Sequence, residues 1–160
     1  MEKLFELAAT RQEVSCPPIW MMRQAGRYQK SYMAYKEKFT FEQMCKLCGP
    51  ASDIAMLPIK EFDFDCAILF SDILFHVEAL GLPLHFDPGP KFEVHLNEEN
   101  FEDYSFVPNE TIKHLDFQSR ALQATREKLD YRKTLLGFVG GPWTLMNYAI
   151  GDNTVSDEFK

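Results

Sequence analysis

The stretch Cys66-Ala67-Ile68-Leu69-Phe70-Ser71-Asp72 begins with five consecutive apolar residues and ends in a serine and an aspartate. An apolar run of this length, without polar alternation, is typical of a β-strand that is covered on both faces, as in a parallel sheet. Residues 19–22 and 134–139 form two further short apolar runs of the same kind. The sequence therefore predicts three buried strands, with Asp72 at the carboxyl end of the second.

Helical patterns separate these runs. Thr40 and Gln43 form a capping-box pattern, and Pro142 suits the first turn of a helix. Gly49-Pro50 should end one helix, and Pro58 should kink or shorten the next. The predicted helices cover residues 2–11, 31–38, 40–48, 51–62, 110–131 and the segment from Pro142. Strands that alternate with helices predict an α/β fold with a parallel sheet.

Three shorter expectations concern the segments between and within these elements. Residues 81–90 are rich in Gly and Pro and are expected to form a loop, and residues 91–96 alternate like a small strand. In the long helix 110–131, five residues fall near one stripe and are expected to face the core: Ile112, Leu115, Ser119, Leu122 and Leu129.

Composition narrows the class of protein. The chain has 160 residues, of which 46% are hydrophobic and 26% charged, as in an ordinary globular domain. Its net charge of −7 argues against a nucleic-acid partner, and no apolar run approaches the roughly 20 residues that span a bilayer. The N-terminus carries no signal-peptide pattern, so a cytoplasmic protein is expected. The four cysteines lack the partners of a zinc site and are expected to be reduced thiols, mostly buried.

Polar features follow each predicted strand at its carboxyl end. Arg23 and Arg27 follow the first run, Asp72 ends the second, and the glycine-rich segment 140–148 follows the third. Ligand sites of α/β barrels and open α/β sheets form at this edge. We therefore expect these features to contribute to one site.

The arginine pair has two interpretations. Each guanidinium offers a planar fork that suits a carboxylate, and Gly26 between the arginines permits a tight turn. Alternatively, Arg23 and Arg27 are surface residues that pair with the surplus of acidic side chains. Spacing alone leaves both interpretations open.

The remaining candidates also have two readings each. Asp72 could cap a helix that starts at Ile73, or it could accept N–H groups of a ligand and face a cation. The segment 137–144 lacks the endings of a P-loop and of a dinucleotide-binding loop. Its glycines suit either the floor of a site for a flat ligand or a tight turn with Trp143 in the core. The hydroxyl of Tyr148 could face the mouth of such a site, whereas the four histidines are expected to be structural or on the surface.

Three of these stretches resemble the signatures of the uroporphyrinogen decarboxylase family. They are residues 18–28 (Pro-Ile-Trp-Met-Met-Arg-Gln-Ala-Gly-Arg-Tyr), residues 67–74 around Asp72, and residues 137–148, and their order and spacing agree with the family. The resemblance implies a (β/α)8 TIM barrel, of which this chain supplies roughly the first three βα units. It also implies that residues 1–160 form the N-terminal part of a single barrel domain, without a separate second domain.

The resemblance further implies a carboxy-lyase of haem biosynthesis. Such an enzyme removes the carboxyl groups of the four acetate side chains of uroporphyrinogen III, giving coproporphyrinogen III, without a metal or organic cofactor. The implied catalytic residues are Asp72, which accepts the pyrrole N–H groups, and Arg23. The implied substrate-binding residues are Arg23, Gln24, Ala25, Gly26, Arg27, Asp72, Phe138 and Tyr148. A homodimer is expected for the full-length protein.

One departure from the family is the length, because a (β/α)8 barrel needs about 250 residues. We therefore expect the 160-residue chain alone to be incomplete and inactive. Two other readings are a non-catalytic remnant that still binds a tetrapyrrole or another anion, and a corrinoid-linked methyltransferase of the same superfamily.

Overall fold

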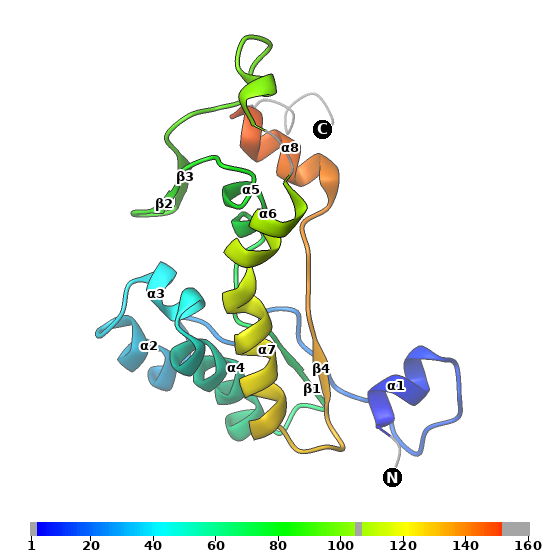
Figure 1. The fold of residues 1–160 in the computed structure, drawn as a ribbon. Helices are drawn as coiled ribbons and strands as arrows, with labels where there is room; N and C mark the ends of the chain where they lie inside the picture. The colour runs from blue at the N-terminus through cyan, green and yellow to red at the C-terminus, as the bar shows by residue number, and fades with distance from the viewer. Residues whose placement is uncertain (1–2, 105–106, 152–160) are drawn as a thin grey trace, which may run out of the picture. The chain divides into compact units, whose positions relative to one another are not determined.

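The computed structural model describes residues 3–104 and 107–151. The chain divides into two compact units, each built from two separate segments (Figure 1). Unit 1 comprises Met1–Ser71 and Phe117–Phe138, and unit 2 comprises Asp72–Asp116 and Val139–Lys160. In chain order the elements are α1 (Leu4–Ala9), α2 (Lys30–Lys36), α3 (Phe41–Lys46), α4 (Cys48–Phe62), β1 (Cys66–Ile68), α5 (Phe75–Glu78), β2 (Leu84–Phe86), β3 (Pro90–Phe92), η1 (Phe101–Asp103), α6 (Pro108–His114), α7 (Asp116–Lys128), β4 (Thr134–Leu136) and α8 (Pro142–Ile150).

Unit 1 is organised around a parallel strand pair. β1 pairs with β4 in a register that sets Cys66 opposite Thr134 and Ile68 opposite Leu136. A bond of 3.0 Å from the Thr134 N–H to the Asp65 carbonyl lies just before this pairing. Cys66 and Ala67 are fully buried. The two buried strands expected at 66–70 and 134–139, and their parallel pairing, are confirmed, although both strands are shorter.

Helices α4 and α7 lie beside this strand pair (Figure 1), and apolar side chains of the helices pack against those of the strands. Met56 and Ile59 of α4 form a cluster with Ala67 of β1 and Leu129, which follows α7. A second cluster joins Ala51, Leu69 and Ala121. The two helices are also linked directly, because the Lys128 ammonium donates to the Ser52 hydroxyl and to Asp53 at 2.7 Å. This packing is the core of unit 1.

The strand predicted at residues 19–22 is wrong, because this segment is irregular and exposed. The Ile19 N–H donates a hydrogen bond to the Asp65 carboxylate at 2.7 Å, and the Ile19 carbonyl accepts one from the Asp65 N–H at 3.1 Å. The next acceptor on β1, the Cys66 carbonyl, is bound by the side chain of Gln24 at 2.6 Å. A backbone ladder therefore does not continue, and Met22 is 71% exposed.

The helices around Pro50 begin and end differently from the prediction. The capping box is confirmed, since the Thr40 hydroxyl accepts from the Gln43 N–H at 3.2 Å and the Gln43 side chain accepts from the Thr40 N–H at 2.9 Å. The break lies at Leu47 rather than at Gly49-Pro50. Pro50 falls in the first turn of α4, where a backbone N–H has no intrahelical partner. α4 also continues past Pro58 to Phe62, so Pro58 does not shorten it.

The long helix predicted for 110–131 consists of two helices, α6 and α7, which are separated at Leu115. This break shifts the helical phase, so the predicted stripe is correct only in part: Leu115 is partly buried, and Leu122 packs against the cluster of Ala51, Leu69 and Ala121. Ile112 is 65% exposed and Ser119 is exposed, whereas Leu129 is buried as expected. The buried face of α7 consists of Phe117, Ala121 and Thr125, which follow one another at intervals of four residues.

Unit 2 contains an antiparallel hairpin and short helices. β2 pairs with β3, with Leu84 opposite Phe92, so the segment 81–90 contains a strand where we expected only a loop. β3 is shorter than the strand expected at 91–96. Leu74, Phe75 and Leu82 are the large side chains most deeply buried in this unit. α8 begins at Pro142 as predicted, but Trp143 is 67% exposed and does not lie in the core.

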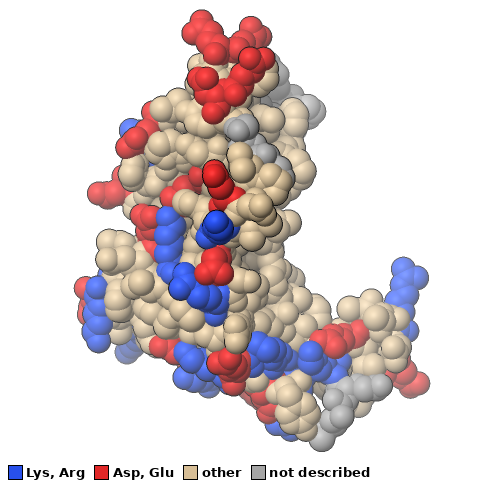
Figure 2. Space-filling model, viewed as in Figure 1, with Lys and Arg blue, Asp and Glu red and all other residues tan. Residues whose placement is uncertain are grey.

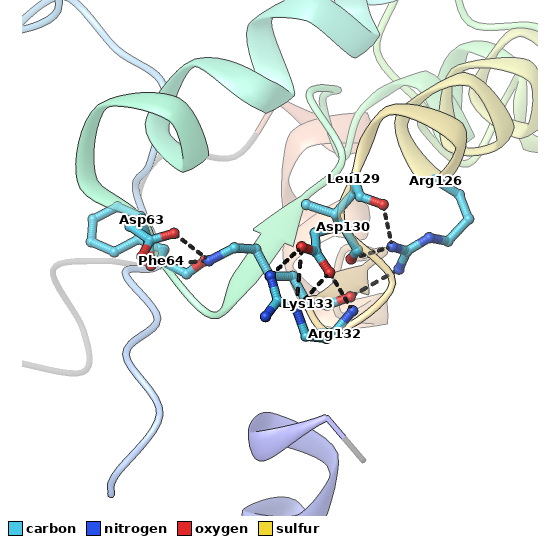
Figure 3. A network of polar contacts seen from close by, with 7 residues as sticks. All are labelled: Asp63, Phe64, Arg126, Leu129, Asp130, Arg132 and Lys133. Atoms are coloured by element: carbon cyan, nitrogen blue, oxygen red, sulfur yellow. Dashed lines mark hydrogen bonds and ion pairs between the residues drawn. The ribbon is translucent and has the colours of Figure 1, made fainter. Parts of the chain in front are cut away.

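A polar network holds the ends of unit 1 at which β1 and β4 begin (Figure 3). The Arg126 guanidinium donates to the carbonyls of Leu129, Asp130 and Lys133 at 2.7–2.9 Å. The Lys133 ammonium binds the Asp63 carboxylate at 2.7 Å and the carbonyls of Asp63 and Phe64. Figure 2 shows basic side chains gathered over this end of the unit. The network thus satisfies backbone carbonyls after α4 and α7.

Two further observations concern the described part of the chain. None of its helices has the length and apolar character required to cross a membrane. All four cysteines are free thiols, with Cys45 and Cys66 buried, Cys48 partly buried and Cys16 exposed. Burial raises the pKa of the Cys66 thiol to about 11, which keeps this thiol protonated near neutral pH.

Candidate functional site

Unit 1 contains a cavity of about 780 Å³ beyond the carboxyl ends of β1 and β4. Its lining comes from Trp20, residues 22–28, residues 68–71 after and within β1, residues 136–138 at the end of β4, and Ala55 of α4. Most of the exposed surface in the cavity is apolar. This is the edge of a parallel sheet at which barrel and open-sheet proteins place their ligands.

The arginine loop, residues 22–28, contributes the cationic groups of this cavity. Arg23 and Arg27 are both exposed, and neither forms an ion pair with another residue among those that the structure describes. The alternative in which these arginines pair with the chain's acidic side chains is therefore not observed. Both guanidinium groups retain their donors for an anion.

The backbone of the arginine loop is attached to β1. Gln24 is only 2% exposed, and its side-chain N–H donates to the Cys66 carbonyl at 2.6 Å. The Tyr28 hydroxyl donates to the Gln24 carbonyl. A turn is closed by a bond of 3.0 Å from the Gln29 N–H to the Gly26 carbonyl. Sequence reasoning assigned only the backbone of Gln24 to the site and missed its side chain, since nothing in the spacing reveals an unpaired strand carbonyl.

The segment after the loop is attached to α4. Gln29 is buried and donates to the Glu61 carboxylate at 3.0 Å, and the Ser31 hydroxyl donates to the other oxygen of Glu61. At Gly26, a Cβ atom would lie 3.4 Å from the Tyr28 ring, so a larger residue here would crowd this ring. Glu61 is a second supporting residue that the sequence did not indicate.

Aromatic side chains supply much of the apolar lining. Phe138, predicted to pack on a flat ligand, is partly buried against the cluster of Ala51, Leu69 and Ala121 and lines the cavity. Trp20 and Phe70 line it as well, and sequence reasoning did not assign them to the site. Their signal was present only as membership of the apolar runs that precede Arg23 and Asp72.

Asp72 and Tyr148 belong to unit 2 and are not among the residues that line this cavity. Asp72 directly follows Ser71, which does line it, and one carboxylate oxygen of Asp72 accepts from the Leu74 N–H at 2.8 Å. Burial raises the pKa of the Asp72 carboxyl group, and the bond from Leu74 opposes this shift. The N-cap of α5 is Leu74, so Asp72 is not the helix cap considered from the sequence.

The other candidates carry little chemistry. Tyr148 lies on α8 with 43% of its surface exposed, and its hydroxyl forms no hydrogen bond within the described residues. His85 and His114 pair with Glu93 and Glu78, as expected of surface histidines. Among residues 3–104 and 107–151, no three His, Cys, Asp or Glu side chains are grouped so that they could hold a metal ion.

Comparisons with known proteins agree with the three sequence signatures. Residues 1–159 match the family model "Uroporphyrinogen decarboxylase (URO-D)". The uroporphyrinogen decarboxylase of Anaeromyxobacter dehalogenans (strain 2CP-C) is 41% identical over 158 residues, which cover 94% of this chain and 45% of that protein. That of Neisseria gonorrhoeae (strain ATCC 700825 / FA 1090) is 41% identical over 159 residues, which cover 98% and 44%. The chain therefore spans about half the length of the curated relatives it matches.

A solved structure shares the fold. A methyltransferase from Methanosarcina mazei superposes with a TM-score of 0.76 over 98% of this chain and 47% of its own, at 17% sequence identity. This likeness concerns the fold alone and carries nothing about the reaction. With the family match, it identifies the fold as part of a (β/α)8 barrel, as predicted. The model match over nearly all residues and the relatives at about 40% identity show that this chain belongs to the uroporphyrinogen decarboxylase family.

Proposed function

We propose that this chain contributes to the decarboxylation of the four acetate side chains of uroporphyrinogen III, which yields coproporphyrinogen III in haem biosynthesis. The observation that carries the proposal is the pair of unpaired arginines on the rim of an apolar cavity at the strand ends. A tetrapyrrole has an apolar ring with carboxylates around it and is complementary to this arrangement. The cavity volume of about 780 Å³ also falls within the usual range for small-molecule sites.

The residues would act in distinct roles. Arg23 and Arg27 would bind substrate carboxylates, assisted by the backbone of Gln24, Ala25 and Gly26. Phe138 would pack on the macrocycle. In unit 2, Asp72 would accept the inward pyrrole N–H groups through the carboxylate oxygen that Leu74 does not use, and Tyr148 would hydrogen-bond a side chain. These two assignments rest on the family membership and not on the cavity of unit 1.

The chemistry requires a sink for the electrons of the broken bond. Protonation of a pyrrole carbon makes the ring cationic, the C–COO⁻ bond then breaks, and its electron pair enters the ring as CO2 leaves. Protonation of the resulting exocyclic carbon yields the methyl group, and loss of the proton that was first added to the ring carbon restores the neutral pyrrole. The negative charge of Asp72 would stabilise the ring cation, and Arg23 would donate or position a proton. Because the substrate supplies the sink, the scheme needs no metal or organic cofactor.

The first test measures binding by the 160-residue chain. Uroporphyrin, the fluorescent oxidised form of the substrate skeleton, is titrated with the purified chain and with Arg27→Met. We expect saturable binding by the unmutated chain and roughly tenfold weaker binding by Arg27→Met, since a hydrogen bond to a charged group contributes about 1.5–3 kcal/mol when buried and less at an exposed rim. Gln12→Met, which changes an exposed residue outside the cavity, is the control. No saturable binding by the unmutated chain would refute the proposed site.

The second test concerns Asp72 and uses a chimera in which this chain replaces the matching part of the Neisseria gonorrhoeae relative. Unit charges about 4 Å apart attract by roughly 4 kcal/mol at an effective dielectric of 20. If half of this attraction is specific to the transition state, Asp72→Asn lowers kcat by about 30-fold. Full coproporphyrinogen formation by Asp72→Asn would contradict the role. Tight uroporphyrin binding without decarboxylation in the unmutated chimera would instead favour a non-catalytic remnant.

Three broader features belong to the same proposal. The two units form one barrel domain, which is supported by their interleaved segments in the chain. A cytoplasmic location is supported by four free cysteines, which suit a reducing compartment. Homodimer formation is supported by exposed apolar side chains outside the cavity, such as Ile112, and sedimentation equilibrium of the chimera tests it. We also expect the 160-residue chain alone to form no coproporphyrinogen.

A further inference from the structure

We propose that the Gln24 side chain and the Tyr28 hydroxyl are positioning residues that fix the backbone of the arginine loop on β1, so that Arg23 and Arg27 reach a polycarboxylate from a fixed base. The proposal rests on the function proposed above for these arginines. Arg23 directly precedes Gln24, and Arg27 directly precedes Tyr28. Each arginine is therefore covalently next to a residue that the structure holds in place.

The attachment of Gln24 follows from the direction of the carbonyl groups of β1. Alternate residues of a parallel strand bond to opposite neighbours. The Asp65 carbonyl accepts from the Thr134 N–H, and the Leu69 N–H donates to the Leu136 carbonyl, so both residues face β4. Cys66 is offset from them by an odd number of residues, so its carbonyl faces the opposite edge of β1. There the Gln24 side chain donates to it at 2.6 Å. Within the described chain, this amide takes the place that a backbone N–H of a further strand would occupy.

The orientation of the Gln24 amide is determined by chemistry. If the amide were reversed, its oxygen would face the Cys66 carbonyl oxygen at 2.6 Å, and two acceptors would oppose each other. The nitrogen must therefore face β1. The amide oxygen is then buried and has no hydrogen-bond partner among the residues that the structure describes.

This unpaired oxygen argues that Gln24 serves placement more than stability. Replacing Gln24 by methionine, which has a similar length, removes the unpaired amide oxygen but leaves the Cys66 carbonyl without its donor. One unpaired acceptor is exchanged for another, so folding should change little. The loop, however, loses its attachment to β1. The two effects can be measured separately.

Tyr28 holds the same residue from the other side. Its hydroxyl donates to the Gln24 carbonyl, so the side chain and the carbonyl of Gln24 are both engaged. Tyr28 is itself exposed, and Tyr28→Phe removes only the hydroxyl. This variant therefore loosens the loop without disturbing the core.

The first experiment reports on the loop without any ligand. Trypsin cleaves after arginine, and cleavage inside a folded chain requires local opening. In the unmutated chain, cleavage after Arg23 and Arg27 should be slow compared with cleavage after exposed Arg132. Gln24→Met should accelerate cleavage at the two loop sites by about tenfold, with an unchanged rate at Arg132 and no fall in melting temperature. Gln12→Met, the same change at an exposed glutamine, should leave all these rates unchanged. Equal loop cleavage in the unmutated chain and Gln24→Met would overturn the proposal.

The second experiment asks whether Gln24 acts through Arg27. Uroporphyrin dissociation constants are measured for the unmutated chain, Gln24→Met, Arg27→Met and the double variant. If Gln24 positions Arg27, the penalty for Arg27→Met should be several-fold smaller in the Gln24→Met background than in the unmutated chain. Independent, multiplicative losses would overturn the positioning role.

The two experiments separate the two hypotheses. If the unmutated chain does not bind uroporphyrin, the proposed function fails, while the trypsin rates still decide whether Gln24 fixes the loop. If Gln24→Met does not fold, Tyr28→Phe takes its place in both experiments, with a smaller acceleration in the same direction. Unchanged loop cleavage in Tyr28→Phe would then overturn the proposal.

Discussion

Replacing Arg126 by methionine should destabilise the chain without weakening the uroporphyrin binding proposed above. Arg126 lies on α7, and its guanidinium binds three backbone carbonyls, those of Leu129, Asp130 and Lys133, at 2.7–2.9 Å (Figure 3). These carbonyls belong to the segment that connects α7 to β4. Methionine keeps the aliphatic length of the side chain and removes all the donors.

The expected magnitude follows from these bonds. A hydrogen bond to a charged group contributes about 1.5–3 kcal/mol when water is excluded. The Arg126 bonds are only partly buried, so water replaces part of each loss, and about 1 kcal/mol for each bond is a reasonable value. The sum is about 3 kcal/mol in the free energy of unfolding. For a chain of this size it lowers the Tm by about 6–12 °C.

Circular dichroism during thermal and urea unfolding provides the measurement, with Arg132→Met as the matched control. Arg132 lies in the same turn, but its side chain binds only the Asp130 side chain. Arg132 is exposed and Asp130 is partly exposed, so a much smaller fall in Tm is expected. Uroporphyrin affinity should be unchanged in both variants. Equal shifts for Arg126→Met and Arg132→Met would show that the carbonyl bonds do not stabilise the turn.

Further predictions concern the helix cap and the response to acid. Thr40→Ala should lower the free energy of unfolding by about 1 kcal/mol, because it removes the acceptor for the Gln43 N–H, and Thr40→Ser should restore it in urea titrations. The Arg132 side chain lowers the pKa of the Asp130 carboxyl group from its ordinary 3.8 to about 2. Because the folded pKa is the lower one, this contribution to stability is present above about pH 4 and is lost as the pH falls towards 2. Asp130→Asn should therefore flatten the dependence of Tm on pH in this window, and an unchanged slope would contradict the assignment.

The elements whose apolar residues are buried by neighbours within the chain were predictable. The runs at 66–70 and 134–139 form strands that pair with each other, and side chains of α4 and α7 cover them. The run at 19–22 is also continuously apolar but is irregular and exposed, and the Gln24 side chain occupies the next acceptor on β1. Apolar composition records a tendency towards burial, but it does not say whether a partner strand is available.

Helix breaks were predicted less well, for a local reason. Proline at position 50 was taken as a terminator, yet a proline in the first turn removes an N–H that has no partner there. No glycine or proline near Leu115 indicates the break there. Because of this break, the buried face of α7 consists of Phe117, Ala121 and Thr125. Both errors concern the boundaries of helices, which depend on a few backbone angles.

For the candidate site, the sequence suggested candidate ligand-binding groups but not the residues that hold their backbone in place. Arg23, Arg27 and Phe138 could be proposed because an anion-binding fork and an aromatic face have recognisable chemistry, and all three line one cavity. Gln24, Tyr28 and Glu61 support the loop through bonds to residues that are distant in the sequence or to the backbone. Such bonds leave no periodicity and no motif of their own.

The arginines of unit 1 show how the two ends of the strand pair differ. At the end where β4 begins, the Arg126 guanidinium donates to carbonyl groups of its own chain, so the removal of Arg126 should lower the free energy of unfolding. At the carboxyl ends, Arg23 and Arg27 have no ion-pair partner within the described residues, while the backbone between them is fixed by Gln24. A guanidinium without an ion-pair partner on an anchored backbone contributes little to the stability of the fold. Its free donors contribute to the free energy of binding when an anion is bound. The loss of Arg27 should therefore appear in ligand affinity and not in Tm, which is the reverse of the result expected for Arg126.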